Sequence, residues 1–365
     1  MDGFGVYSCG NRHPDTKSMF FKDLDSRIIR DRIDLVAAYE EYRRVRHEFQ
    51  SELGGSMRFE ERSGRDYLYR RTRRHGVRKT LSLGPRSPET EEILRRFERQ
   101  KAEAEERLAA LSARIDSGAS VMRALGHLRM PAIAARVIRR LNDSPAAARF
   151  RIVGTHALYV YEAAAGVELQ SGFLATADLD VLVDDRAPLR VILSEEVRGL
   201  DAILKGVDGS FAQRRAGDYR LTNKDGFMVE FIRPEARPAH RPTPGQATGI
   251  AGDAVPTPIA GLEWLVNVPA LSAAVIDDRG YPVEVTAPAP AAWAAHKLWI
   301  SAKEDRQRDK AKRDREQAEA VFQLIDERLP GERLDPRRHS AIPREIAALA
   351  LPYAEPRKGR TEPGW

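Results

Sequence analysis

The sequence predicts an α+β protein: a mixed sheet flanked by helices, preceded by a mostly helical amino-terminal region that carries a small basic β-hairpin. Two observations indicate this class. Residues 1–147 hold long helical stretches, interrupted once by short runs of aromatic and branched residues. From about residue 148, strand, turn and helix patterns follow one another in quick succession, which is typical of strands and helices sharing one core.

The amino-terminal region is expected to contain two long helices with the hairpin between them. Residues 20–50 repeat apolar positions at helical spacing without a proline. At about 57–84, short aromatic and branched runs are separated by the turn signals RSGR and RRHG. The next helix begins at SPET, where a serine precedes a proline at the first helical position.

The predicted hairpin is strongly basic. Tyr67 and Tyr69 interleave with its cations, which are Arg70, Arg71, Arg73, Arg74, Arg78 and Lys79. Cations near exposed aromatic rings are typical of surfaces that bind phosphate backbones and stack bases. A solvated turn is the alternative interpretation of the same charge run.

Composition excludes several classes of protein. Among 365 residues Cys9 is the only cysteine, so neither an intrachain disulfide nor a cysteine-cluster zinc site can form. The formal net charge of +6 does not by itself indicate nucleic-acid binding. We find no leader pattern and no apolar run long enough to span a bilayer, so we expect a soluble, cytoplasmic protein without membrane partners.

Three pieces of the middle region carry chemistry. IVGTHALYVY predicts a strand that leads Gly154 and Thr155 to a helix start, where free N–H groups favour a phosphate. In ATADLDVLVDD, Asp178 and Asp180 lie two apart on a strand, so both side chains point the same way and favour a cation. Glu230 lies inside the apolar strand FMVEFI, where an unpaired carboxylate is costly. Each signal is weak alone, since a tight turn, a chance D-x-D and an edge-exposed acid explain them separately.

Taken together, the three pieces resemble the DNA polymerase beta-type nucleotidyltransferase superfamily. The resemblance rests on Gly-Thr, then T-x-D-x-D-x-L from Thr176 to Leu182, then an acid in a later apolar strand, and it covers about residues 148–326. Within the superfamily, the chain is most similar to bacterial toxin-like abortive-infection transferases. Gly154-Thr155 departs from the usual Gly-Gly or Gly-Ser, and the toxin-like members often carry an arginine shortly before the aspartates, where this chain has Leu174 and Ala175.

The resemblance implies a nucleotidyltransferase-type sheet and a two-metal site for Mg²⁺ or Mn²⁺ held by Asp178, Asp180 and Glu230. These three carboxylates are then the catalytic residues, with Gly154 and Thr155 holding phosphate. It further implies that the basic carboxyl-terminal helix contacts nucleotide phosphates through Lys297, Arg308 and Lys312, with Asp314 as an orienting partner. Helical spacing of Lys297, Ser301, Arg308 and Lys312 predicts one common face, and an exposed helix with i,i+4 pairs is the alternative. His296 is expected to pack against Trp293 or Trp299.

The sequence predicts a helical region with its hairpin at 1–147 and a catalytic domain at 148–287. A second helical region at 288–350 is expected to contain one long helix from about 288 to 328 and to complete the site. Residues 351–365 are expected to form a flexible tail. The leading hypothesis is transfer of a nucleoside monophosphate from an NTP to an acceptor hydroxyl, with RNA or tRNA favoured over a protein or a small molecule. The alternatives are a catalytically silent nucleotide- or nucleic-acid-binding module, and the toxin-like half of a toxin–antitoxin pair held by a regulatory protein partner.

Overall fold

The computed structural model describes residues 20–74, 77–184, 199–235, 250, 252–335 and 337–354. Within these ranges residues 73, 74, 77 and 354 are described by their backbone alone. The tail expected at 351–365 lies outside the described residues from 355 onward. The described part before it continues as a helix to Ala354.

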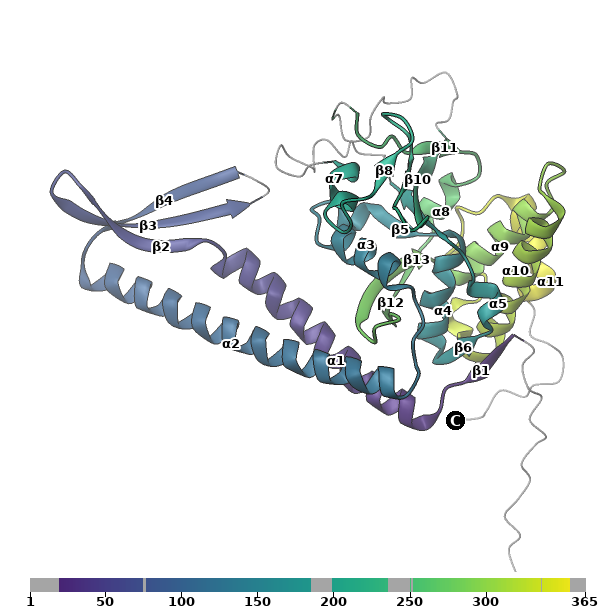
Figure 1. Cartoon of the computed structure of the whole chain (residues 1–365), viewed down its shortest axis with the longest axis horizontal. Coiled ribbons are helices and arrows are strands. Elements are labelled where there is room, and N and C mark those ends of the chain that lie inside the picture. The colour runs from purple at the N-terminus through teal and green to yellow at the C-terminus, as the bar shows by residue number, and fades with distance from the viewer. Residues whose placement is uncertain are drawn as a thin grey trace, which may run out of the picture.

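A mixed sheet organises the body of the molecule (Figure 1). The strand order is β5-β7-β10-β9-β8, and β11 pairs with the end of β10. β7 and β10 run parallel, whereas β5 and β9 run antiparallel to their neighbours. The strands are β5 (Phe150–Ile152), β7 (Asp178–Val183), β8 (Ala212–Gln213), β9 (Arg220–Thr222), β10 (Met228–Pro234) and β11 (Thr257–Ile259). The mixed sheet predicted from the sequence is confirmed.

Helices and two small sheets enclose this central sheet, and one apolar core joins them. The helices are α3 (Ala132–Asn142), α4 (Ala157–Ala165), α5 (Ser171–Leu174), α7 (Leu200–Lys205), α8 (Glu263–Asn267), α9 (Pro290–Ser301), α10 (Arg308–Arg328) and α11 (Arg344–Ala354). One small sheet pairs β12 (Ala270–Ile276) with β13 (Pro282–Pro288), and the other pairs β1 (Phe21–Asp23) with β6 (Val167–Leu169). Trp264 and Trp293 are among the largest fully buried side chains.

The amino-terminal region forms an arm. Helices α1 (Ser26–Glu48) and α2 (Pro88–Ala124) lie side by side and extend away from the body, with a three-stranded antiparallel sheet at the far end (Figure 1). That sheet contains β2 (Ser56–Arg62), β3 (Arg65–Arg74) and β4 (Val77–Pro85), one strand more than a hairpin. Ser87 caps α2 as expected: its hydroxyl accepts from the Thr90 N–H at 3.3 Å. With 37 residues, α2 is about 55 Å long.

The root of the arm is fixed to the body. Arg32 of α1 donates a hydrogen bond to the carbonyl of Ala163 at 2.7 Å. A small apolar cluster joins Leu35 of α1 and Met122 of α2 to Ile276 of β12. The base of the arm therefore has its own core, whereas its far end lies outside both apolar clusters.

The prediction of one helix from about 288 to 328 is wrong. α9 ends at Ser301 and α10 begins at Arg308, and the two helices fold back against each other. Lys297 Nζ lies 2.7 Å from Asp314 Oδ1, although 17 residues of continuous helix would separate them by about 26 Å. Lys297, Arg308 and Lys312 therefore do not share one helical face. None of the described helices is long and apolar enough to cross a membrane.

Candidate active site

Strand pairing brings the three predicted carboxylates together. In the parallel register of β7 and β10, Asp180 lies opposite Glu230. Because side chains alternate along a strand, Asp178 points to the same face as both of them. All three carboxylates line a cavity of about 330 Å³, together with Gly154, Thr155 and Lys297. Residues from two strands, the turn at Gly154 and helix α9 thus share one cavity.

Burial and the neighbouring acids make the charged form of Asp180 costly. Burial, then the charges of Asp178 and Glu230, raises the pKa of the Asp180 carboxyl to about 7. Burial also raises the pKa of Glu230, although the nearby Arg220 guanidinium partly opposes this shift. A proton or a metal cation would relieve the repulsion.

No three His, Cys, Asp or Glu side chains in the described ranges are already arranged as a metal-ion site. The contacts of the carboxylates explain this. Glu230 Oε1 lies 2.7 Å from Arg220 Nε, and Asp178 accepts a hydrogen bond from the Thr176 hydroxyl. All donors are nevertheless carboxylate oxygens, the ligands that Mg²⁺ and Mn²⁺ prefer. The residues present fit such an ion, and Glu230 would exchange its ion pair with Arg220 for the cation.

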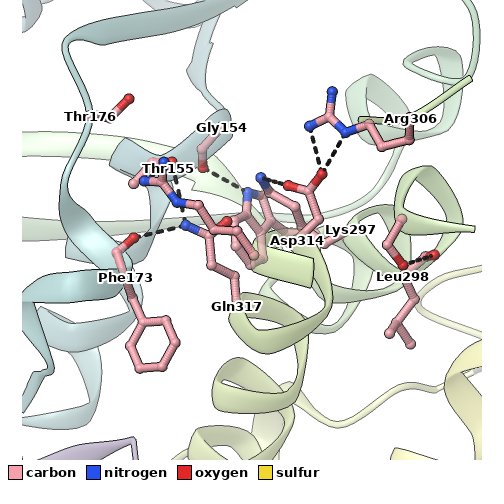
Figure 2. Close-up of polar contacts among 12 residues, drawn as sticks. Gly154, Thr155, Phe173, Thr176, Lys297, Leu298, Arg306, Asp314 and Gln317 are labelled. Atoms are coloured by element: carbon pink, nitrogen blue, oxygen red, sulfur yellow. Dashed lines mark hydrogen bonds and ion pairs between the residues drawn. The ribbon is translucent and has the colours of Figure 1, made fainter. Parts of the chain in front are cut away.

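Gly154 lies directly against Asp180. A Cβ atom at Gly154 would be 1.8 Å from Asp180 Oδ2, and the φ of Gly154 is +58°. Its carbonyl accepts a hydrogen bond from Trp293 Nε1 at 3.1 Å, which ties this turn to α9 (Figure 2). Both the close approach and the left-handed backbone require glycine. As predicted, Gly154 and Thr155 connect β5 to a helix, through a 3-10 turn that precedes α4.

Helix α10 positions Thr155. Arg313 Nη2 and Gln317 Nε2 donate to the Thr155 hydroxyl at 3.5 and 3.4 Å. Gln317 also donates to the carbonyl of Phe173 at 2.8 Å (Figure 2), and Arg313 donates to that of Ala175. One face of α10 therefore contacts the turn at Gly154 and Thr155 and the segment leading into β7.

A buried ion-pair cluster supports the opposite wall. Asp314 is 2% exposed and lies between two cations: Lys297 at 2.7 Å and Arg306, whose nitrogens reach the other carboxylate oxygen at 2.6 and 2.8 Å (Figure 2). Lys297 Nζ also lies 5.3 Å from the ring centroid of Trp293. Asp314 thus holds Lys297 and Arg306 at the cavity, which is the arrangement that the resemblance implied for Lys297 and Asp314.

The other two predicted cations lie elsewhere. Arg308 and Lys312 are exposed and do not line the cavity, and Lys312 lies 3.9 Å from Glu316. Their expected alignment with Lys297 is wrong because the chain turns between α9 and α10. The cavity is lined instead by Arg306, Lys310 and Arg313. Residues 310, 313, 314 and 317 share one face of α10 by their spacing.

Sequence reasoning also missed Arg220. It lies on β9, which pairs antiparallel with β10 so that Arg220 is directly opposite Glu230. Its guanidinium also lies 4.6 Å from the ring centroid of Tyr219. β9 is only three residues long, which is too short for an alternating pattern to predict it.

A larger cavity, about 1020 Å³, lies between α1 and the residues after α3. Its cations are already paired: Arg43 with Glu284, and Arg46 with Asp143 at 3.2 Å. These pairs join the arm to the body. The cavity holds no carboxylate cluster comparable to the one on β7 and β10, so we assign the chemistry to the smaller cavity.

A mixed sheet with three carboxylates on neighbouring strands, a glycine turn at a helix start and a basic helix opposite defines the nucleotidyltransferase class of enzymes. The family model described as Nucleotidyltransferase matches residues 132–343, and the chain belongs to that family. The protein is therefore a transferase of phosphorus-containing groups. The match begins at α3, so the arm lies outside it. No curated protein and no solved structure matches the chain.

Proposed function

We propose that this enzyme transfers a nucleoside monophosphate from an NTP to an acceptor hydroxyl and releases pyrophosphate. The observation that carries the proposal is the register of β7 and β10, which places Asp180 opposite Glu230 in a cavity that Asp178 also lines. The acceptor oxygen forms a bond to the α-phosphorus, and the bond from that phosphorus to the pyrophosphate oxygen breaks. Glu230 is the residue that we assign to receive the hydroxyl proton.

Asp178 and Asp180 are the proposed ligands for Mg²⁺ or Mn²⁺, with Glu230 as the third. When bound, such ions neutralise phosphate charge and make the acceptor hydroxyl more acidic. The raised pKa of Asp180 supports this assignment, because a bound cation would offset the burial and the acid–acid repulsion that raise it. Arg220 pairs with Glu230, and a bound ion would take the place of this pairing.

The phosphate-binding groups surround the carboxylates. Gly154 and Thr155 offer backbone and hydroxyl donors next to the start of α4, where the helix dipole favours negative charge. Lys297, Arg306, Lys310 and Arg313 line the cavity and supply positive charge for the triphosphate.

The acceptor that we propose is RNA, with tRNA first, since the arm carries a basic sheet and lies outside the family match. A protein side chain or a small metabolite is the second choice. RNA and NTPs meet in the cytoplasm, which is the compartment that we assign.

The proposal is tested by incubating the protein with total RNA, each of four labelled NTPs, and Mg²⁺ or Mn²⁺. The wild type and the exposed control Asp225→Asn should label RNA, whereas Asp178→Asn/Asp180→Asn should not. Full transfer by the double variant would overturn the metal assignment. Label on the protein itself would replace RNA with a protein acceptor. Metal-dependent NTP binding without transfer to any acceptor would make the chain a silent nucleotide-binding module.

A further inference from the structure

The sheet at the end of the arm has two different faces. Along β3, Leu68 and Arg70 point toward α2: Leu68 is fully buried, and the Arg70 guanidinium lies 4.5 Å from the Phe97 ring centroid. Arg70 also donates to the carbonyls of Glu52 and Gly54 at 2.9 and 2.7 Å. Arg70 therefore packs the sheet onto the helices. These contacts do not support the nucleic-acid contact predicted for it.

The alternate residues of β3 form the outer face. Tyr67, Tyr69 and Arg71 share it, and strand pairing adds Arg58 opposite Tyr69 and Thr80 opposite Arg71. Arg62 and Arg78 follow at the same alternation. None of these residues is buried. By register Arg73 pairs with Arg78 and Arg74 with Val77, but the side chains of Arg73 and Arg74 are outside the described set. Lys79 lies on the same face of the sheet as Arg70.

The outer face combines positive charge with accessible rings. Glu60 is its acid, and it accepts one hydrogen bond each from Arg58 and Arg71, both at 2.8 Å. A guanidinium has five donors, so both arginines keep donors for other anions. The Arg62 guanidinium lies 5.6 Å from the ring centroid of Tyr69, within cation–π range.

We propose that this outer face binds single-stranded nucleic acid, stacking bases on Tyr67 and Tyr69 and pairing phosphates with the surrounding arginines. The rings are two residues apart on one strand, or about 7 Å. Duplex bases are stacked about 3.4 Å apart and paired, so they cannot present separate faces to two such rings. A single strand can splay its bases apart and stack one on each ring.

The position of the sheet gives the surface a role of its own. Figure 1 shows the sheet along the outer half of the arm, with the end of β3 directed back toward the body, while the active-site cavity lies within the body. The sheet therefore holds a part of the acceptor remote from the reacting hydroxyl. That use in catalysis rests on the proposed transferase function, whereas the binding itself does not and can be measured without NTP or metal.

The test is fluorescence anisotropy of the full-length protein with a labelled 12-nucleotide single-stranded RNA, against the same sequence as a duplex and against phosphatidylserine vesicles. Tyr67→Ala/Tyr69→Ala should weaken RNA binding about tenfold or more, and Tyr67→Phe/Tyr69→Phe, which keeps both rings, should bind like the wild type. Arg58→Ala/Arg71→Ala should also reduce the slope of log affinity against log salt by about 1.4. The charge-matched control Arg96→Ala/Arg99→Ala, on the exposed surface of α2, should stay within twofold of the wild type.

Unchanged RNA affinity in the tyrosine-to-alanine variant, or equal affinity for the duplex, would overturn the proposal. Loss of binding in the phenylalanine variant would reject ring stacking. If vesicles bind and the same substitutions abolish that binding while RNA does not bind, the face is a membrane surface instead. Asp178→Asn/Asp180→Asn should bind RNA like the wild type, so failure of the transferase proposal would leave this result standing.

Discussion

At the scale of single residues, the site depends on a position where a side chain is missing. Gly154 combines a left-handed backbone with a carboxylate at contact distance, and both conditions exclude a Cβ atom. The aspartates were recognisable from their spacing, but the need for glycine becomes evident only from the Asp180 oxygen beside it.

We expect Gly154→Ala to abolish transfer and weaken metal binding, because the new methyl group displaces Asp180. Gly166→Ala is the matched control: Gly166 has a similar φ of +67°, but a Cβ atom there would meet nothing within 4 Å. Both substitutions should cost about 1–2 kcal/mol of stability from backbone strain. Manganese binding followed by calorimetry and transfer assays should then separate the two. Equal activity in both variants would contradict the steric role of Gly154.

A second prediction concerns His296, which packs between Trp264 and Trp299, with ring centroids 5.3 and 5.7 Å away. Burial, then the neighbouring Lys297 charge, lowers the pKa of His296 to about 3, whereas an unfolded histidine titrates near 6.5. The folded state therefore binds fewer protons, and its stability falls as the pH drops below about 6.5. From pH 6.5 to 4.5 the loss should be about 2 kcal/mol.

Urea unfolding at several pH values measures this loss. His296→Phe keeps a ring between the tryptophans and removes the titration, so its stability should fall less steeply over the same range. A wild type and a variant with parallel pH profiles would show that His296 does not carry the acid sensitivity.

At the scale of elements, the site is assembled from strands and helices that are distant in sequence. β7 and β10 supply the acids, β9 supplies the arginine opposite Glu230, and the turn between α9 and α10 lets two helices face the sheet. The buried ion pair of Lys297 with Asp314 joins those two helices.

Lys297→Met should destabilise the protein by about 2–3 kcal/mol. Removing one partner leaves Asp314 buried with Arg306 as its remaining cation. The double variant Lys297→Met/Asp314→Leu should recover most of that stability, since Arg306 is one-third exposed and can turn to water. Both variants should lack transfer activity if Lys297 binds the triphosphate. Calorimetry that finds the single variant as stable as the wild type would reject the coupling of α9 to α10.

At the scale of the whole molecule, the arm and the body rely on different cores. The body core extends from Phe20 to Ala350, and the root of the arm shares the cluster of Leu35 and Ile276. The buried Leu68 and Phe97 at the far end belong to neither cluster. We therefore expect the body to fold without the far end of the arm.

Replacing residues 56–85 with a short glycine-serine linker should leave the melting temperature of the body nearly unchanged. Leu35→Ala at the root should instead cost about 2–4 kcal/mol, because it opens a cavity in the cluster that joins arm and body. Differential scanning calorimetry distinguishes the two. A body that melts much earlier after the deletion would show that the far end contributes to its core.

Local sequence patterns predicted much of this molecule. The start of α2 follows from Ser87 and Pro88. Alternation alone placed Asp178 and Asp180 on one face of a strand. The error at 288–328 arose because helix propensity continues through residues 302–307, and only packing of α9 against α10 interrupts it.

The sequence by itself determined the class of chemistry, because the glycine, the paired aspartates and the later glutamate are set by residue type and local spacing. The tertiary structure decided which residues meet. It paired Asp180 with Glu230, brought Arg220 to that glutamate, and exchanged Arg308 and Lys312 for Arg306, Lys310 and Arg313 at the cavity. These are contacts between segments far apart in the chain, and their register comes from the burial of a shared core, which local propensity does not encode.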